Sequence, residues 1–126
     1  MESKMAAGSL ISIVDDDASM RDALVGLVRS LGCDARGFAS AEDFLACDEL
    51  GRFSCLITDI QMPGMSGFDL KRQLERRHST LPVIMITARS DPGLREKAMS
   101  IGATCFLRKP FETAVLLDCL ERALRA

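Results

Sequence analysis

The chain has 126 residues, 48% of them hydrophobic, and a formal net charge of -2. This length fits one compact domain with a proper core and leaves no room for a second. The small net charge gives no reason to expect direct binding to nucleic acid or membranes, and no apolar run reaches the roughly 18 residues that a membrane span needs. We expect residues 1–9 to be a disordered leader, residues 10–126 to form the domain, and the protein to be cytoplasmic.

Short apolar runs alternate with longer stretches of helical spacing along the chain. The apolar runs span residues 10–14, 33–38, 55–58, 83–87 and 104–107. The stretches with apolar residues at helical spacing are 20–31, 41–45, 68–74, 94–101 and 116–124. Five strand–helix repeats with right-handed crossovers predict an α/β fold, in which helices cover both faces of a doubly wound parallel sheet.

Reactive side chains lie at the ends of four of the five predicted strands. Asp15 and Asp16 follow the first strand, Asp59 follows the third, Thr87 ends the fourth and Lys109 lies just beyond the fifth. Parallel sheets of this kind bind their ligands outside the carboxyl ends of the strands. We therefore expect these carboxylates, the hydroxyl and the ammonium group to converge at one edge of the sheet.

This set of side chains suits phosphoryl chemistry. Carboxylates that share one edge repel one another unless a cation joins them, and oxygen ligands that leave room for water favour Mg²⁺. The ammonium group and the hydroxyl can contact a tetrahedral anion, and an aspartate can act as the nucleophile that forms an acyl phosphate. A Mg²⁺-dependent phosphoaspartate at Asp59 is the prediction.

Four segments of the chain carry a resemblance to a known family. Residues 13–17 read IVDDD, residues 56–67 read LITDIQMPGMSG, residues 83–88 read VIMITA and residues 106–111 read FLRKPF. From residue 10 to about 124 the sequence resembles the receiver domain of two-component response regulators, and residues 37–45, GFASAEDFL, resemble its FixJ-like branch, whose members often control transcription. The resemblance implies the CheY-like, flavodoxin-like fold with strand order 2-1-3-4-5 and five helices.

The resemblance also assigns roles to individual residues. It implies that Asp59 is the phosphoacceptor and that Lys109 contacts the phosphoryl group. Asp16, Asp59 and the backbone carbonyl of Gln61 would be ligands of Mg²⁺, and Asp15 would act through a metal-bound water. The peptide bond between Lys109 and the proline after it is expected to be cis.

Six further residues receive roles from the same resemblance. Thr87 and Phe106 would form the switch: the threonine moves to the phosphoryl group, the aromatic ring takes the vacated space, and the surface of the fourth helix and fifth strand changes. Gln61, Ala88 and Arg89 would tune access to the acyl phosphate and its hydrolysis. Gly67 is expected to serve close backbone packing or a turn.

The function expected is a signalling switch and not an enzyme beyond weak self-catalysed phosphoryl transfer and dephosphorylation. Its partner would be a sensor histidine kinase or a phosphotransfer protein, and the face of the fourth helix, fifth strand and fifth helix can form a phosphorylation-dependent homodimer. An aspartate-nucleophile phosphatase would need an acid at position 61, where the chain has Gln61, and a flavin module would need Trp or Tyr, which the chain lacks. A degenerate receiver that only docks is disfavoured because every phosphorylation residue is present.

Several other residues are expected to be structural. Asp17 should cap the first helix, and His78 should be a solvated surface residue because no second ligand lies near it in the sequence. The cysteines, five in number and without a C-x-x-C pair, are expected to be small buried hydrophobes in a reducing compartment. Three methionines are expected to pack in the core: Met20, Met85 and Met99.

Overall fold

The sheet has five parallel strands in the order β2-β1-β3-β4-β5. The computed structural model describes residues 8–125. Its strands are β1 (Leu10–Val14), β2 (Asp34–Phe38), β3 (Cys55–Asp59), β4 (Val83–Thr87) and β5 (Cys105–Arg108). The predicted fold and strand order are therefore confirmed, with strand ends shifted by a residue or so.

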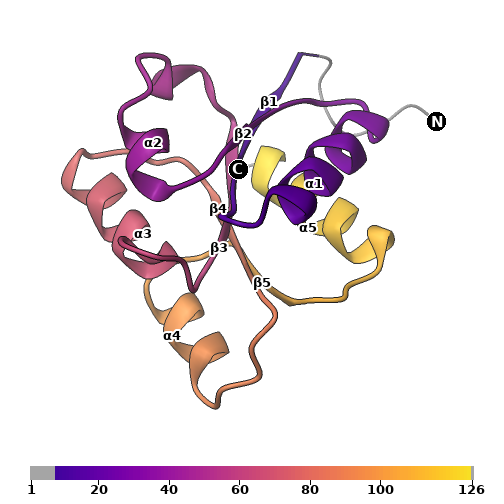
Figure 1. The fold of residues 1–126 in the computed structure, drawn as a ribbon. Helices are drawn as coiled ribbons and strands as arrows, with labels where there is room; N and C mark the ends of the chain where they lie inside the picture. Colours follow the sequence, from indigo (N-terminus) through magenta and orange to yellow (C-terminus); the bar gives the residue numbers. More distant parts are fainter. Residues whose placement is uncertain (1–7, 126) are drawn as a thin grey trace.

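Within residues 8–125, five α-helices alternate with the strands and cover both faces of the sheet (Figure 1). They are α1 (Ala18–Ser30), α2 (Ala41–Leu45), α3 (Gly67–Arg76), α4 (Leu94–Ser100) and α5 (Thr113–Arg125), with a short 3₁₀ turn, η1 (Leu50–Arg52). Helices α1 and α5 lie on one face, and α2, α3 and α4 lie on the other (Figure 1). None of the described helices is long and apolar enough to cross a membrane.

Each face of the sheet buries its own apolar core. On one face, Ile13 and Ile57 pack with Leu24 of α1 and Leu120 of α5. On the other, three rings form an aromatic cluster with centroids 5.3 to 5.9 Å apart: Phe38, Phe44 and Phe53. Burial on both faces explains why β1, β3 and β4 read as continuous apolar runs and not as alternating strands.

The register of the sheet brings the reactive strand ends together. Val14 pairs with Thr58, so Asp15 and Asp59 end neighbouring strands at the same level. Asp59 in turn lies beside Ile86, and Thr87 lies beside Arg108, the residue before Lys109. The carboxyl edge of the sheet therefore carries the carboxylates, the hydroxyl and the ammonium group together.

The structure differs from the sequence-based expectations at two kinds of position. Met99 was expected in the core, but its side chain is 46% exposed because it faces outward from α4. Cys105 and Cys119 form a disulfide, so the expectation of thiols throughout is wrong for this pair. Of the predicted leader, residues 1–7 lie outside the described residues.

Candidate functional site

An acidic pair and one ammonium group form the centre of the site. The Lys109 ammonium donates to Oδ2 of Asp15 at 3.1 Å and to Oδ2 of Asp59 at 3.4 Å. Asp15 is fully buried, and the side chains of Asp59 and Lys109 are 13% and 12% exposed. The three strand ends thus meet as a partly buried ion cluster, which is where an ionic interaction is least screened by solvent.

The backbone at the strand ends holds each carboxylate in place. Oδ1 of Asp59 accepts from the Ile60 amide at 2.7 Å, and Oδ1 of Asp15 accepts from the Asp17 amide at 3.0 Å. Asp17 itself is the N-cap of α1, as predicted, and accepts from two amides of the first turn. Arg21, which sequence reasoning missed, donates to the Asp15 carbonyl at 2.7 Å. The Arg21 guanidinium therefore links the first turn of α1 to the backbone at the end of β1.

Burial and a like charge perturb the carboxyl group of Asp59. Its pKa is raised above the usual aspartate value, mainly because burial penalises the charged form, and the negative charge of Asp15 adds to this increase. The Lys109 ammonium and the Ile60 amide act in the opposite direction. The net rise means that one lysine does not fully offset the desolvation and repulsion of the two carboxylates.

The acidic cluster is arranged to hold a divalent cation. Asp15, Asp16 and Asp59 each offer a carboxylate oxygen, and these oxygens lie within 4.8 Å of one another. Asp16 is exposed, so the cluster opens to solvent on that side and leaves space for water ligands. Oxygen-only ligands with retained water match the preference of Mg²⁺, so the residues present fit this ion.

The predicted switch threonine is engaged with a neighbouring loop. The buried Thr87 hydroxyl donates to Oε1 of Gln61 at 2.9 Å and accepts from the Arg89 amide at 3.0 Å. The Gln61 side chain therefore meets Thr87 at the rim of the acidic cluster. Ala88 is small and exposed, and the Arg89 guanidinium turns outward to Asp91, 2.8 Å away.

The predicted aromatic partner, Phe106, is buried on β5. Its ring lies under the guanidinium of Arg95, whose central carbon is 5.0 Å from the ring centroid. Such a cation–π contact is typically worth about 0.5–1 kcal/mol at an exposed site. Arg95 belongs to α4 and was missed, because no sequence spacing relates a helix residue to a ring on the next strand. It joins the ring to the helix that the switch would move.

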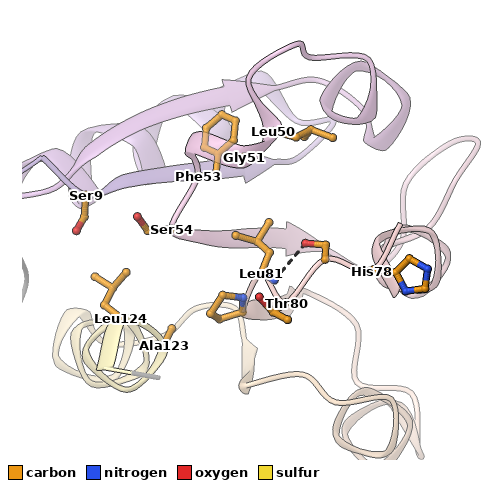
Figure 2. A pocket seen from close by; sticks show the side chains of 12 residues that line it. Ser9, Leu50, Gly51, Phe53, Ser54, His78, Thr80, Leu81, Ala123 and Leu124 are labelled. Atoms are coloured by element: carbon orange, nitrogen blue, oxygen red, sulfur yellow. Dashed lines mark hydrogen bonds between the residues drawn. The ribbon is translucent and has the colours of Figure 1, made fainter. Parts of the chain in front are cut away.

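The other residues of interest lie away from this edge. A cavity of about 770 Å³ lies at the amino ends of the strands, where Ser9, Ser54 and Leu81 line it (Figure 2). No aspartate or glutamate of the described chain lines it. His78, at its rim, is exposed as predicted and adopts a left-handed backbone conformation with φ 59°. At the carboxyl edge itself, the expected cis bond between Lys109 and Pro110 is present.

Removing the charge of Asp59 is expected to stabilise the metal-free protein. Because its pKa is raised on folding, ionised Asp59 opposes folding, and stability falls as pH rises from the unfolded to the folded pKa. In chelator at pH 7, Asp59→Asn should melt several degrees higher than the native protein, and the gap should close below about pH 4. Mg²⁺ should raise the melting temperature of the native protein more than that of the variant.

Thermal unfolding followed by circular dichroism measures both effects. Asp48→Asn, in an exposed turn outside the cluster, is the matched control and should change neither the melting temperature nor its response to Mg²⁺. An Asp59→Asn protein less stable than the native one in chelator would show that the cluster is not repulsive.

Comparison with known proteins gives consistent matches over nearly the whole chain. A family model described as the response regulator receiver domain matches residues 11–121. The transcriptional regulatory protein TdiR of Thauera aromatica is 38% identical over 121 residues, which are 96% of this chain and 53% of TdiR. The transcriptional regulatory protein FixJ of Bradyrhizobium diazoefficiens is 37% identical over 115 residues, 91% of this chain and 56% of FixJ.

Solved structures agree with the sequence matches. The crystal structure of FixJ-N has a TM-score of 0.87 at 36% identity, covering 95% of this chain and 96% of that chain. The chain spans about half the length of the curated relatives it matches.

Proposed function

Because the chain belongs to the family of response regulator receiver domains, we propose that it is a phosphorylation-activated switch of a two-component system, in which Asp59 accepts the phosphoryl group. The observation that carries the proposal is the cluster at the carboxyl edge of the sheet, where Asp59 meets both Lys109 and the other two carboxylates. The donor would be a sensor histidine kinase or a phosphotransfer protein.

The geometry gives Asp59 the properties of a nucleophile. One of its oxygens accepts from the Ile60 amide and the other faces Lys109, so the carboxylate is held in one orientation at the rim of the cluster. A carboxylate oxygen attacks phosphorus, the bond from phosphorus to the donor breaks, and an acyl phosphate forms. Lys109, already within reach of Asp59, would then contact an oxygen of the transferred group.

The metal ligands proposed are Asp16, Asp59 and the backbone carbonyl of Gln61, with Asp15 acting through a water. When bound, Mg²⁺ would offset the negative charge of the carboxylates and of the incoming phosphoryl group. Asp15 is positioned for an indirect role because it is fully buried, whereas Asp59 is partly buried and Asp16 is exposed.

The readout would begin at Thr87. To donate to a phosphoryl group on Asp59, its hydroxyl must leave Oε1 of Gln61, which is its acceptor in this structure. Phe106 would move into the space that Thr87 vacates, and the ring would then separate from the guanidinium of Arg95 on α4. A local charge would thereby change the surface of α4 and β5, which is a two-state element biased from the phosphorylation site.

The output proposed is control of transcription. TdiR and FixJ are both transcriptional regulators by name, and this chain matches only about half of each. The receiver domain would therefore act through another part of a longer regulator and not touch nucleic acid itself. Phosphorylation-dependent pairing of two receivers through α4, β5 and α5 remains a prediction.

A labelling experiment tests the proposed function. The protein is incubated with acetyl phosphate or phosphoramidate, with Mg²⁺ or with chelator, and its intact mass is measured. We expect the mass of one added phosphoryl group in Mg²⁺ and none in chelator, because the carboxylate cluster needs a cation to accept another anion. Folded protein that gains no mass from either donor in Mg²⁺ would refute the proposal.

A further inference from the structure

A disulfide links β5, the edge strand of the sheet next to β4, to α5. Cys105 is the first residue of β5 and Cys119 lies in the middle of α5, 14 residues later, with Cα atoms 6.1 Å apart. Both residues are buried, and Cys105 directly precedes Phe106. The phosphorylation chemistry proposed above makes no use of this pair.

A guanidinium group lies against both sulfur atoms. Nη2 of Arg122 is 2.9 Å from Sγ of Cys105 and 3.6 Å from Sγ of Cys119. Nε of the same group pairs with Oδ2 of Asp118 at 3.2 Å, which fixes the guanidinium one turn along α5. A neighbouring arginine favours the thiolate form of a cysteine, and the thiolate is the form that attacks peroxides and disulfides.

A groove connects the sulfur atoms to the surface. It has a volume of about 280 Å³ between α4, β5 and α5, and its lining includes both cysteines and Arg122. The exposed large hydrophobic side chains of the described chain, Met99 at 46% and Val115 at 43%, lie on this same groove. A small oxidant or reductant can therefore approach the pair from solvent through the groove.

The other cysteines differ from this pair. Burial raises the pKa of the Cys55 thiol to about 12, so it holds its proton at neutral pH, and burial also raises the pKa of Cys33. Cys47 is half-buried and its sulfur also lies near a guanidinium, 3.6 Å from Nη1 of Arg36, but the structure gives it no disulfide partner. Disulfide formation within the chain should therefore fall on Cys105 and Cys119.

We infer that Cys105 and Cys119 form a reversible thiol–disulfide couple, oxidised by hydrogen peroxide and reduced by a dithiol, that controls the surface between α4, β5 and α5. The Cys105 thiolate, closest to Arg122, attacks one peroxide oxygen; the O–O bond breaks, a sulfenic acid forms and one water is released. The Cys119 thiol then attacks the sulfenic sulfur and displaces a second water. Two thiols and one peroxide give one disulfide and two waters, and a dithiol reverses the bond by exchange.

The regulatory consequence rests on the proposed function. The switch requires Phe106 and the start of β5 to change their relation to the neighbouring helices. A covalent bond from the adjacent Cys105 to α5 restrains that change. The oxidised protein therefore accepts phosphoryl groups at Asp59 but responds less strongly at α4 and β5, whereas the reduced protein responds fully.

Alkylation of thiols tests the redox couple without reference to phosphorylation. Protein reduced with dithiothreitol is treated with hydrogen peroxide, denatured, alkylated with N-ethylmaleimide and weighed. Native protein and the control Cys47→Ser should each lose two alkylatable thiols, and peptide mapping should find the bond between Cys105 and Cys119. Cys105→Ser and Cys119→Ser, or the alanine variants if a buried serine impairs folding, should form no such bond. Arg122→Met should oxidise roughly tenfold more slowly.

Two results would overturn the couple. One is that peroxide leaves both thiols open to alkylation; the other is that dithiothreitol reduces the bond only after denaturation, which would make it an inert structural link.

The effect of the disulfide on the switch surface is tested by amide hydrogen exchange with Mg²⁺ and beryllofluoride, a phosphoryl mimic. The change in exchange at α4 and β5 should be at least about twofold smaller in the oxidised protein.

Equal changes in amide exchange in the oxidised and reduced proteins would overturn only the proposal that the disulfide limits the response at α4 and β5. No change in either form would count against the proposed switch, while the redox couple would still stand or fall on alkylation. The two failures are therefore distinguishable.

Discussion

Asp59→Asn is expected to reduce phosphoryl incorporation from acetyl phosphate in Mg²⁺ to background. The amide has no charge and is a poor nucleophile, so the acyl phosphate cannot form at this position. The buried Asp15 cannot replace it, because its side chain is 0% exposed, whereas that of Asp59 is 13% exposed and open to a donor. Asp16 is exposed and lacks the lysine contact seen at Asp59. Intact mass after incubation with the donor measures the loss.

Two variants sharpen this experiment. Asp48→Asn removes an exposed carboxylate outside the cluster and should label as the native protein does. Asp59→Glu keeps the charge but moves the carboxylate by one methylene, and it should also lose most of the label because Lys109 and the Ile60 amide are placed for the shorter side chain. An Asp59→Asn protein that labels to the native extent would contradict the assignment of the phosphoacceptor.

Gly67→Ala is expected to lower the free energy of unfolding by roughly 2–3 kcal/mol. Gly67 is the first residue of α3, and its amide donates to the Ile60 carbonyl at 2.9 Å. An added Cβ would lie 2.5 Å from the Asp59 carbonyl oxygen and 3.1 Å from the Ile60 Cα. Both atoms are backbone, so the clash can be relieved only by moving α3 away from the end of β3. Denaturant unfolding measures the loss.

Gly26→Ala is the matched control for this change. Gly26 lies inside α1, and an added Cβ there would meet no atom within 4 Å. Alanine favours the helix, so this variant should gain about 0.5–1 kcal/mol. Since Gly67→Ala displaces the backbone that carries Asp59, it should also slow phosphoryl incorporation, whereas Gly26→Ala should not. A Gly67→Ala protein as stable as the native one would disprove the close packing.

Much of the fold could be predicted from the sequence because the apolar runs, the helical spacing and the order of strands and helices all indicate the same architecture. Continuous apolar runs indicated a sheet buried on both faces, and the repeated order of strand and helix left few topologies open. The site followed from the same logic, since parallel strands place their carboxyl ends at one edge. This placement predicts that Asp15, Asp59 and Lys109 converge, and the structure shows that they do.

The sequence does not predict the side-chain contacts between one helix or strand and another. The disulfide depends on how α5 packs against β5, and the spacing of Cys105 and Cys119 carries no sign of it. The position of Arg95 over Phe106 depends in the same way on the rotation of α4. The misplacement of Met99 has the same cause, because the apolar pattern of this short helix does not decide which side faces the sheet.

The most direct test of the central claim is to locate the phosphoryl group chemically. Protein labelled with acetyl phosphate and Mg²⁺ is treated with borohydride, which reduces an aspartyl phosphate to homoserine, and its peptides are sequenced by mass spectrometry. We predict homoserine at position 59 and unmodified aspartate at positions 15 and 16. Homoserine at either of those two positions, or a phosphoryl group on His78 with Asp59 unchanged, would contradict Asp59 as the phosphoacceptor.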